Sequence, residues 1–267
     1  TLFYQCENQN YWNLQDNIHV FSHPTLEHLI IRHARIHEQA FEFPEKPRAT
    51  ALKTLKFLEC DINTDALYDI LSLPEALTEL TITQLEVPEP PLTEASNLID
   101  DYVLAIEAVS HSLENLNIDF PSLTAKSPMR LRDFDRLTHL ELRDYQLYGQ
   151  AKPRLLSVGL PPSLQTLKFS SQIGEDQEIV ELLCLTIDKK EILARKWTKM
   201  IVEGAGRPPP EILKVCEKFD GFLIEKRQTR RRLVSSDSVI MEISSPVTEK
   251  FDMSDIFQEQ HQRSSQK

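Results

Sequence analysis

Long apolar runs are missing from this sequence, since no stretch of 18 or more consecutive apolar residues occurs in its 267 positions. A helix that crosses a bilayer needs about 20 such residues, so we expect no membrane span and no membrane partner. No basic segment followed by an apolar one opens the chain, which begins at Thr1 rather than at methionine. We therefore expect the natural protein to extend upstream of Thr1.

Cysteine is sparse, and the four residues stand far apart at Cys6, Cys60, Cys184 and Cys216. None of them forms a CxxC pair, so neither a zinc site nor a dense disulfide framework is predicted. Reduced thiols of this kind are typical of the cytoplasm or the nucleus. Cys60 and Cys216 fall on apolar positions of the pattern described below, and we expect both to be inert core thiols.

Acidic residues outnumber basic ones, 41 to 30, and the resulting net charge of −11 argues against nucleic-acid binding. Residues 226–267 hold 8 Lys and Arg and 6 Asp and Glu, a net charge of +2, which leaves −13 for residues 1–225. The acidic part of the chain is expected to favour basic or neutral partners.

Recognisable reaction chemistry is also missing. The sequence contains no GxSxG turn and no phosphate-binding glycine loop, and the glycines at Gly204 and Gly206 are followed by Arg207 and prolines. His33 and His37 have the i, i+4 spacing of a metal pair, but no further ligand recurs nearby. We therefore predict no enzymatic activity, no cofactor and no metal.

One arrangement of leucines recurs along the chain and organises it. In residues 52–62, LKTLKFLECDI, apolar residues stand at the first, fourth, sixth, ninth and eleventh positions. This spacing is typical of the strand and turn of a leucine-rich repeat. The same LxxLxL core begins at Leu26, Leu52, Leu77, Leu113, Leu137 and Leu164, with a weaker copy at Trp197.

The first positions of the six clear repeats are 26, 25, 36, 24 and 27 residues apart. The segments between them are mostly helical in pattern, with helices expected after Asn63, across 93–109, once or twice in 175–196, and from Pro208 to Cys216. A final strand is expected at 222–224.

The predicted fold is therefore α/β: a leucine-rich-repeat solenoid, or horseshoe, with a parallel concave sheet and a mostly helical convex side. Residues 21–225 form this domain and end in a helix-strand cap. Residues 1–20 are either an N-terminal cap or the remnant of an upstream domain. Residues 226–267 are rich in Ser, Gln and charge, and are predicted to be a disordered tail.

The residues between the leucines of each predicted strand face outward and line the concave surface. The predicted partner-binding set is His28, Ile30, Arg32, Thr54, Lys56, Leu58, Glu79, Thr81, Asn115, Asn117, Asp119, His139, Glu141, Arg143, Asp144 and Lys168. Taken singly, each is an ordinary solvated strand residue. Together they form a long face suited to a protein partner, and we rank the charged cluster at His139, Glu141, Arg143 and Asp144 first.

Four segments resemble the repeat region of fungal F-box/leucine-rich-repeat proteins. They are residues 23–29 (HPTLEHL), 51–62 (ALKTLKFLECDI), 73–77 (LPEAL) and 197–204 (WTKMIVEG), and the resemblance covers about residues 18–225. It implies a receptor whose repeats hold a protein substrate, while an N-terminal F-box binds the adaptor of a cullin-type ubiquitin ligase.

The chain departs from this pattern at its beginning. Residues 1–20 are too short for an F-box and lack its leading Leu-Pro helix signature. Either the F-box lies upstream of Thr1, or the protein is a repeat scaffold or adaptor with no role in ubiquitin transfer.

The tail carries two short patterns. Residues 226–232, KRQTRRR, are either a nuclear-import signal or a solvated exit from the fold. The same arginines precede Ser235 and Ser236, which a basophilic kinase would accept, although such patterns also arise by chance. The predicted compartment is accordingly cytoplasmic or nuclear.

Overall fold

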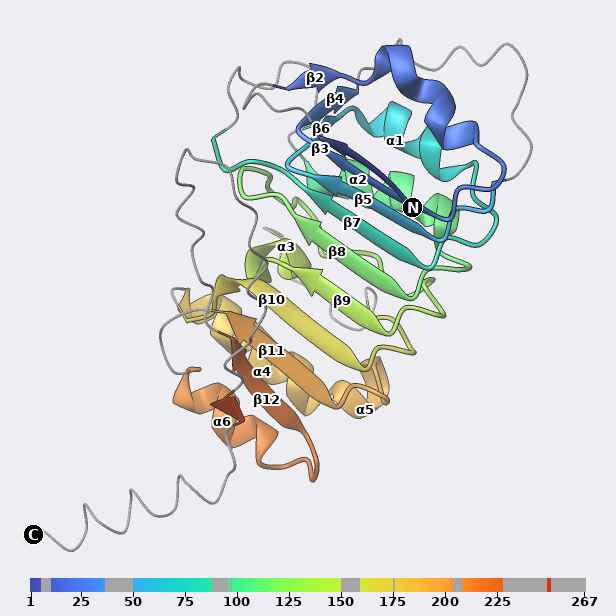
Figure 1. Cartoon of the computed structure of the whole chain (residues 1–267). Coiled ribbons are helices and arrows are strands. Elements are labelled where there is room, and N and C mark those ends of the chain that lie inside the picture. The colour runs from blue at the N-terminus through green and yellow to red at the C-terminus, as the bar shows by residue number, and fades with distance from the viewer. Residues whose placement is uncertain are drawn as a thin grey trace, which may run out of the picture.

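Ten strands form one sheet in the order in which they occur along the chain (Figure 1). The computed structural model describes residues 1–5, 11–36, 50–87, 96, 98–149, 159–174, 176–203, 208–227 and 249–250. The strands of the large sheet are β1 (Leu2–Gln5), β3 (His28–Arg32), β5 (Thr54–Leu58), β7 (Glu79–Thr83), β8 (Asn115–Asp119), β9 (His139–Leu142), β10 (Thr166–Gln172), β11 (Lys199–Glu203), β12 (Leu223–Arg227) and β13 (Glu249–Lys250). Every neighbouring pair is parallel except β12 and β13.

A second, smaller sheet follows the first strands. It contains β2 (Trp12–Asn13), β4 (Ala34–Ile36) and β6 (Asp61–Ile62), which pair in parallel in that order. Since β4 and β6 lie just beyond β3 and β5, the chain remains paired for a short distance after it turns away from the large sheet.

The leucines of the repeated pattern lie side by side on the buried face of the large sheet. The aligned set is Leu29, Leu55, Leu80, Leu116, Leu140 and Leu167. All six are at most 2% exposed, and Met200 and Ile224 continue the row on β11 and β12. The predicted burial of the leucine row is therefore confirmed across these strands.

Helices cover the buried face and lie behind the sheet in Figure 1. They are α1 (Thr64–Leu71), α2 (Ile99–Ile106), α3 (Asp144–Tyr148), α4 (Gln177–Asp188), α5 (Lys190–Leu193) and α6 (Pro210–Cys216), with 3-10 turns η1 (Gln15–Ser22) and η3 (Glu107–Val109). The predicted cap of α1 is confirmed, because the Asn63 side chain accepts hydrogen bonds from the backbone N–H groups of Asp65 and Ala66. The stretch 175–196, where one or two helices were expected, contains two.

The first and the last described strands of the chain belong to the large sheet. β1 pairs with β3, and Leu14, Val20 and Phe21 are buried in the core, so the described part of residues 1–20 covers the first repeat. At the other end, β12 continues through Arg227 and pairs antiparallel with Glu249–Lys250. The rest of the tail, including residues 228–232 of the basic pattern and Ser235 and Ser236, lies outside the described residues.

In the repeat that begins at Leu77, the spacing seen in residues 52–62 places Leu85 and Val87 at the ninth and eleventh positions and predicts that both are buried. Val87 is 75% exposed, while Gln84 is buried. The Gln84 amide donates a hydrogen bond of 3.3 Å to the hydroxyl of Tyr102, which itself donates to the Ile62 carbonyl. A hydrogen-bonded glutamine therefore fills the space that the pattern assigned to an apolar residue. Gln146 is also buried after β9, where it donates to the Phe120 carbonyl at 2.8 Å, but Leu147 beside it is buried as the spacing predicts.

Two cysteines belong to the core, as predicted from their place in the pattern: Cys60 is 0% and Cys216 is 5% exposed. Burial raises the pKa of each thiol to about 12. Cys184 on α4 is partly exposed, and its pKa is also raised, mainly by partial burial and next by the negative charge of Glu211.

Native alkylation should distinguish these thiols. Because iodoacetamide needs both access and thiolate, we expect Cys184 to be modified well before Cys60 and Cys216 at pH 8. In denaturant all three should react at similar rates, and peptide mass mapping over time measures each. Native modification of Cys60 as fast as that of Cys184 would contradict the burial described here.

Candidate protein-binding face

The surface of the large sheet that faces away from the helices is called the outward face below. It is formed by two aligned rows and a shorter third. The first row runs through His28, Thr54, Glu79, Asn115, His139, Thr166, Lys199 and Leu223. The second runs through Ile30, Lys56, Thr81, Asn117, Glu141, Lys168, Ile201 and Glu225. In the third, Arg32 pairs with Leu58, and Thr83 with Asp119.

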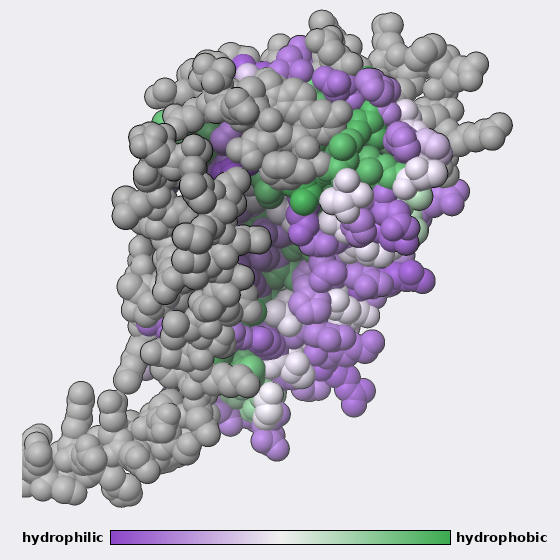
Figure 2. Space-filling model, in the orientation of Figure 1, coloured by the Kyte–Doolittle hydropathy of each residue, from purple (hydrophilic) through white to green (hydrophobic). Residues whose placement is uncertain are grey.

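These rows place fourteen of the sixteen predicted residues together, all except Arg143 and Asp144. They also add residues of β11 and β12 that the sequence reasoning did not include. The weak repeat at Trp197 was the available signal for Lys199 and Ile201. Figure 2, in the same view as Figure 1, shows mostly hydrophilic residues here, interrupted by separate hydrophobic spots.

The cluster ranked first in the sequence does not act as one exposed group. His139 is exposed, but Asp144 is buried in the first turn of α3. Its carboxylate accepts a 2.6 Å hydrogen bond from the Ser171 hydroxyl and another from the Tyr145 backbone N–H. The assignment of Asp144 to the exposed surface is therefore wrong, because the chain turns into a helix immediately after β9.

Arg143 and Glu141 are also held by neighbours. Arg143 is the residue immediately before α3, and its Nε donates a hydrogen bond of 2.7 Å to Asp119. Glu141 lies 2.6 Å from the ammonium group of Lys168, which also lies 2.8 Å from Glu203. Burial lowers the pKa of Lys168, but hydrogen bonds to the two carboxylates outweigh it, and the net shift is upward. Lys168 therefore stays charged between two acids.

Most charges of the outward face are paired in this way. Lys56 lies 2.6 Å from Glu79, and Lys199 pairs with Glu225. Although the chain as a whole is acidic, the carboxylates in these rows therefore have basic partners. A partner that docks here does not need to be basic.

The uncharged centre of the face lies on β8. Asn115 stands between Glu79 and His139, and Asn117 stands between Thr81 and Glu141. The Oδ1 atom of Asn117 is shielded from solvent and has no hydrogen-bond partner among the described residues. Thr54 and Thr81 are only 9% exposed, so they contribute less surface than predicted.

A polar cluster occupies the turns after β3 and β5. Glu59 lies 2.8 Å from Arg32 and 2.6 Å from the imidazole of His33, while Arg35 lies 2.9 Å from Asp61. His33 and Glu59 have φ of 54° and 56°, a conformation that non-glycine residues rarely adopt. The contacts of His33 are thus to a carboxylate of the next repeat, and His37 lies outside the described residues.

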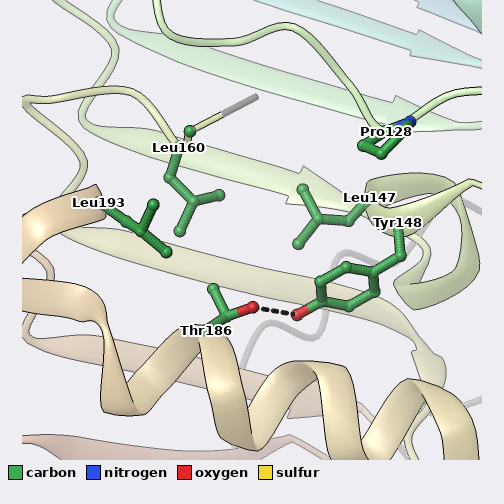
Figure 3. A pocket seen from close by; sticks show the side chains of 7 residues that line it. Pro128, Leu147, Tyr148, Leu160, Thr186 and Leu193 are labelled. Carbon is green, nitrogen blue, oxygen red and sulfur yellow. Dashed lines mark hydrogen bonds between the residues drawn. The ribbon is translucent and has the colours of Figure 1, made fainter. Parts of the chain in front are cut away.

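A small pocket lies apart from the outward face, near α3, α4 and α5 (Figure 3). Its empty space is about 310 Å³, including the part open to solvent, and it is lined by Pro128, Leu147, Tyr148, Gly159, Leu160, Thr186 and Leu193. The Tyr148 hydroxyl donates to Thr186 at 3.2 Å, which satisfies its polar group. Residues 150–158 lie outside the described residues, and we assign no ligand to this pocket.

Within the described ranges, no three His, Cys, Asp or Glu side chains are grouped as metal ligands would be. In the same ranges, no helix has the length and apolar character needed to cross a membrane.

Comparison of the chain with known protein families, with curated proteins and with solved structures found no match in any of the three.

Proposed function

We propose that this chain is a leucine-rich-repeat domain that binds a protein partner on its outward face. One observation carries the proposal: successive strands pair in chain order, so that equivalent outward residues form continuous rows across β3 to β12. Stacked repeats use such extended faces to bind other proteins.

The role that fits the resemblance is the substrate-binding region of an F-box-type ubiquitin-ligase receptor. The F-box would then lie upstream of Thr1 and connect the substrate to the adaptor and cullin. A repeat scaffold or adaptor without a ubiquitin role is the second candidate.

Co-purification separates these two candidates. Full-length protein would be isolated with its upstream residues intact, and the bound adaptor and cullin would be quantified by mass spectrometry. Stoichiometric adaptor supports the receptor role, whereas a partner captured without adaptor supports the scaffold.

The binding face itself is tested by a variant that removes charges in pairs. In His139→Ala/Glu141→Gln/Lys168→Met, the paired Glu141 and Lys168 lose their charges together, although Glu203 loses its contact with Lys168. We expect at least about tenfold less partner to be retained in a quantitative pull-down, since a few central residues dominate most interfaces.

A matched control lies on the helical side. Asp69→Ala/Leu104→Ala changes two exposed residues of α1 and α2 and should retain the partner as the unmodified chain does. Equal retention by both variants would show that the outward face is not the binding surface.

A further inference from the structure

The centre of the outward face has unused hydrogen-bonding groups. No described side chain or backbone group bonds to the amide of Asn115 or Asn117, and the Asn117 Oδ1 is shielded from solvent. A shielded acceptor without a partner costs free energy, because it has lost its water without gaining a replacement. Because the atom is shielded, a ligand reaches it only when the Asn117 side chain rotates toward the ligand, and an N–H group supplied there would then recover that loss.

The spacing of the two asparagines matches a repeating ligand. They are outward residues two positions apart on β8, so their attachment points are about 6.6 Å apart. Equivalent amides of an extended peptide recur at the same interval, every second residue. Each asparagine side chain carries both an NH₂ donor and a carbonyl acceptor, the complement of the C=O and N–H groups of a peptide backbone.

The surrounding charges select against a charged ligand at this point. Lys56 and Glu79 pair on one side, and Glu141, Lys168 and Glu203 pair on the other. Asp119 is bound to Arg143 at the end of β8. A charged side chain placed over β8 would have to break one of these pairs or remain uncompensated beside it.

We propose that Asn115 and Asn117 hold the backbone of an extended, locally uncharged peptide segment that lies along β8. The proposal rests on the protein-binding function proposed above and names the partner chemistry at its centre. Recognition through the backbone would make the central residues of the segment tolerant of side-chain replacement, while the flanking rows select the rest.

Random linear peptides displayed on phage provide the probe. Peptides would be selected on the purified chain and then tested against Asn115→Ala, Asn117→Ala and the control Leu104→Ala, an exposed residue of α2 on the helical side. We expect selected peptides to lack charge at their central positions, and to bind each asparagine variant about tenfold more weakly than the control. The thermal midpoints of Asn115→Ala and the control should match that of the unmodified chain, and that of Asn117→Ala should be no lower, because this substitution removes the unsatisfied acceptor.

Replacing single peptide bonds of a selected peptide by esters tests the backbone contact directly, since an ester lacks the N–H donor. At one position the ester should weaken binding to the unmodified chain about tenfold and have no further effect on Asn117→Ala. Ester effects of equal size in both proteins at every position would overturn the inference.

The variant His139→Ala/Glu141→Gln/Lys168→Met distinguishes failure of this inference from failure of the proposed function. Peptides that depend on His139, Glu141 and Lys168 but not on the asparagines would overturn the inference and leave the binding face in place. If no selected peptide depends on the outward face while the natural partner does, that partner presents a folded surface and the inference is wrong. If neither depends on it, the proposed function fails as well.

Discussion

Replacing Leu80 by alanine is expected to lower the free energy of unfolding by about 2–5 kcal/mol. Leu80 is 0% exposed on β7 and lies between Leu55 of β5 and Leu116 of β8 in the buried row. Removal of the Leu80 side chain leaves a cavity. The neighbouring strands β5 and β8 cannot move in to fill it without breaking their backbone hydrogen bonds to β7. Urea unfolding followed by circular dichroism measures the change.

Lys56→Ala is the matched control on the opposite face of the neighbouring strand. Lys56 and Glu79 are 31% and 36% exposed, and a pair of this kind contributes about 0–1 kcal/mol. Thr81 would be a poorer control, since it is only 9% exposed. Equal losses from Leu80→Ala and Lys56→Ala would contradict the assignment of buried and outward residues.

The strands could be predicted from the sequence because their information is local and repeated. Each LxxLxL core places its buried and outward residues by the alternation of a strand, and similar repeat lengths bring equivalent positions into register. Leu55 and Lys56 illustrate this, since adjacent residues have opposite environments, as expected.

The turns could not be predicted in the same way. Val87 continues the apolar spacing but is exposed, whereas Gln84 is buried and bonds to Tyr102, a residue 18 positions later on α2. The side chain that is buried in this turn therefore has its partner on a helix, and the sequence of the turn does not specify where that helix lies. Gln146 after β9 is likewise buried, although Leu147 beside it follows the prediction.

The sequence predicted which residues lie on the candidate face, but it did not predict which charged residues pair with one another. Arg143 bonds to Asp119, 24 residues earlier, and Asp144 is bonded to Ser171, 27 residues later. The sequence shows these residues as one charged cluster, whereas each interacts with a different neighbouring repeat. Pairing across repeats depends on side-chain reach and local turns, so it becomes visible only with the strands in place.

Gly149→Ala is expected to lower the free energy of unfolding by about 3 kcal/mol. Gly149 ends α3 with φ 65° and ψ −174°, a conformation almost confined to glycine. An added Cβ would lie 2.5 Å from the backbone carbon of Ser127 and 2.6 Å from its oxygen. Because these are backbone atoms, relief requires the 127–128 segment or the end of α3 to move.

Gly221→Ala separates the cost of the backbone conformation from the cost of the steric clash. Gly221 also has a positive φ of 74°, but an added Cβ would meet no atom within 4 Å. Only the backbone conformation is then penalised, at about 1–2 kcal/mol. Urea unfolding of both variants measures the difference, which reports the close approach of Gly149 to Ser127. A loss for Gly149→Ala no larger than that for Gly221→Ala would mean that this approach, and with it the placement of α3 beside residues 127–128, is incorrect.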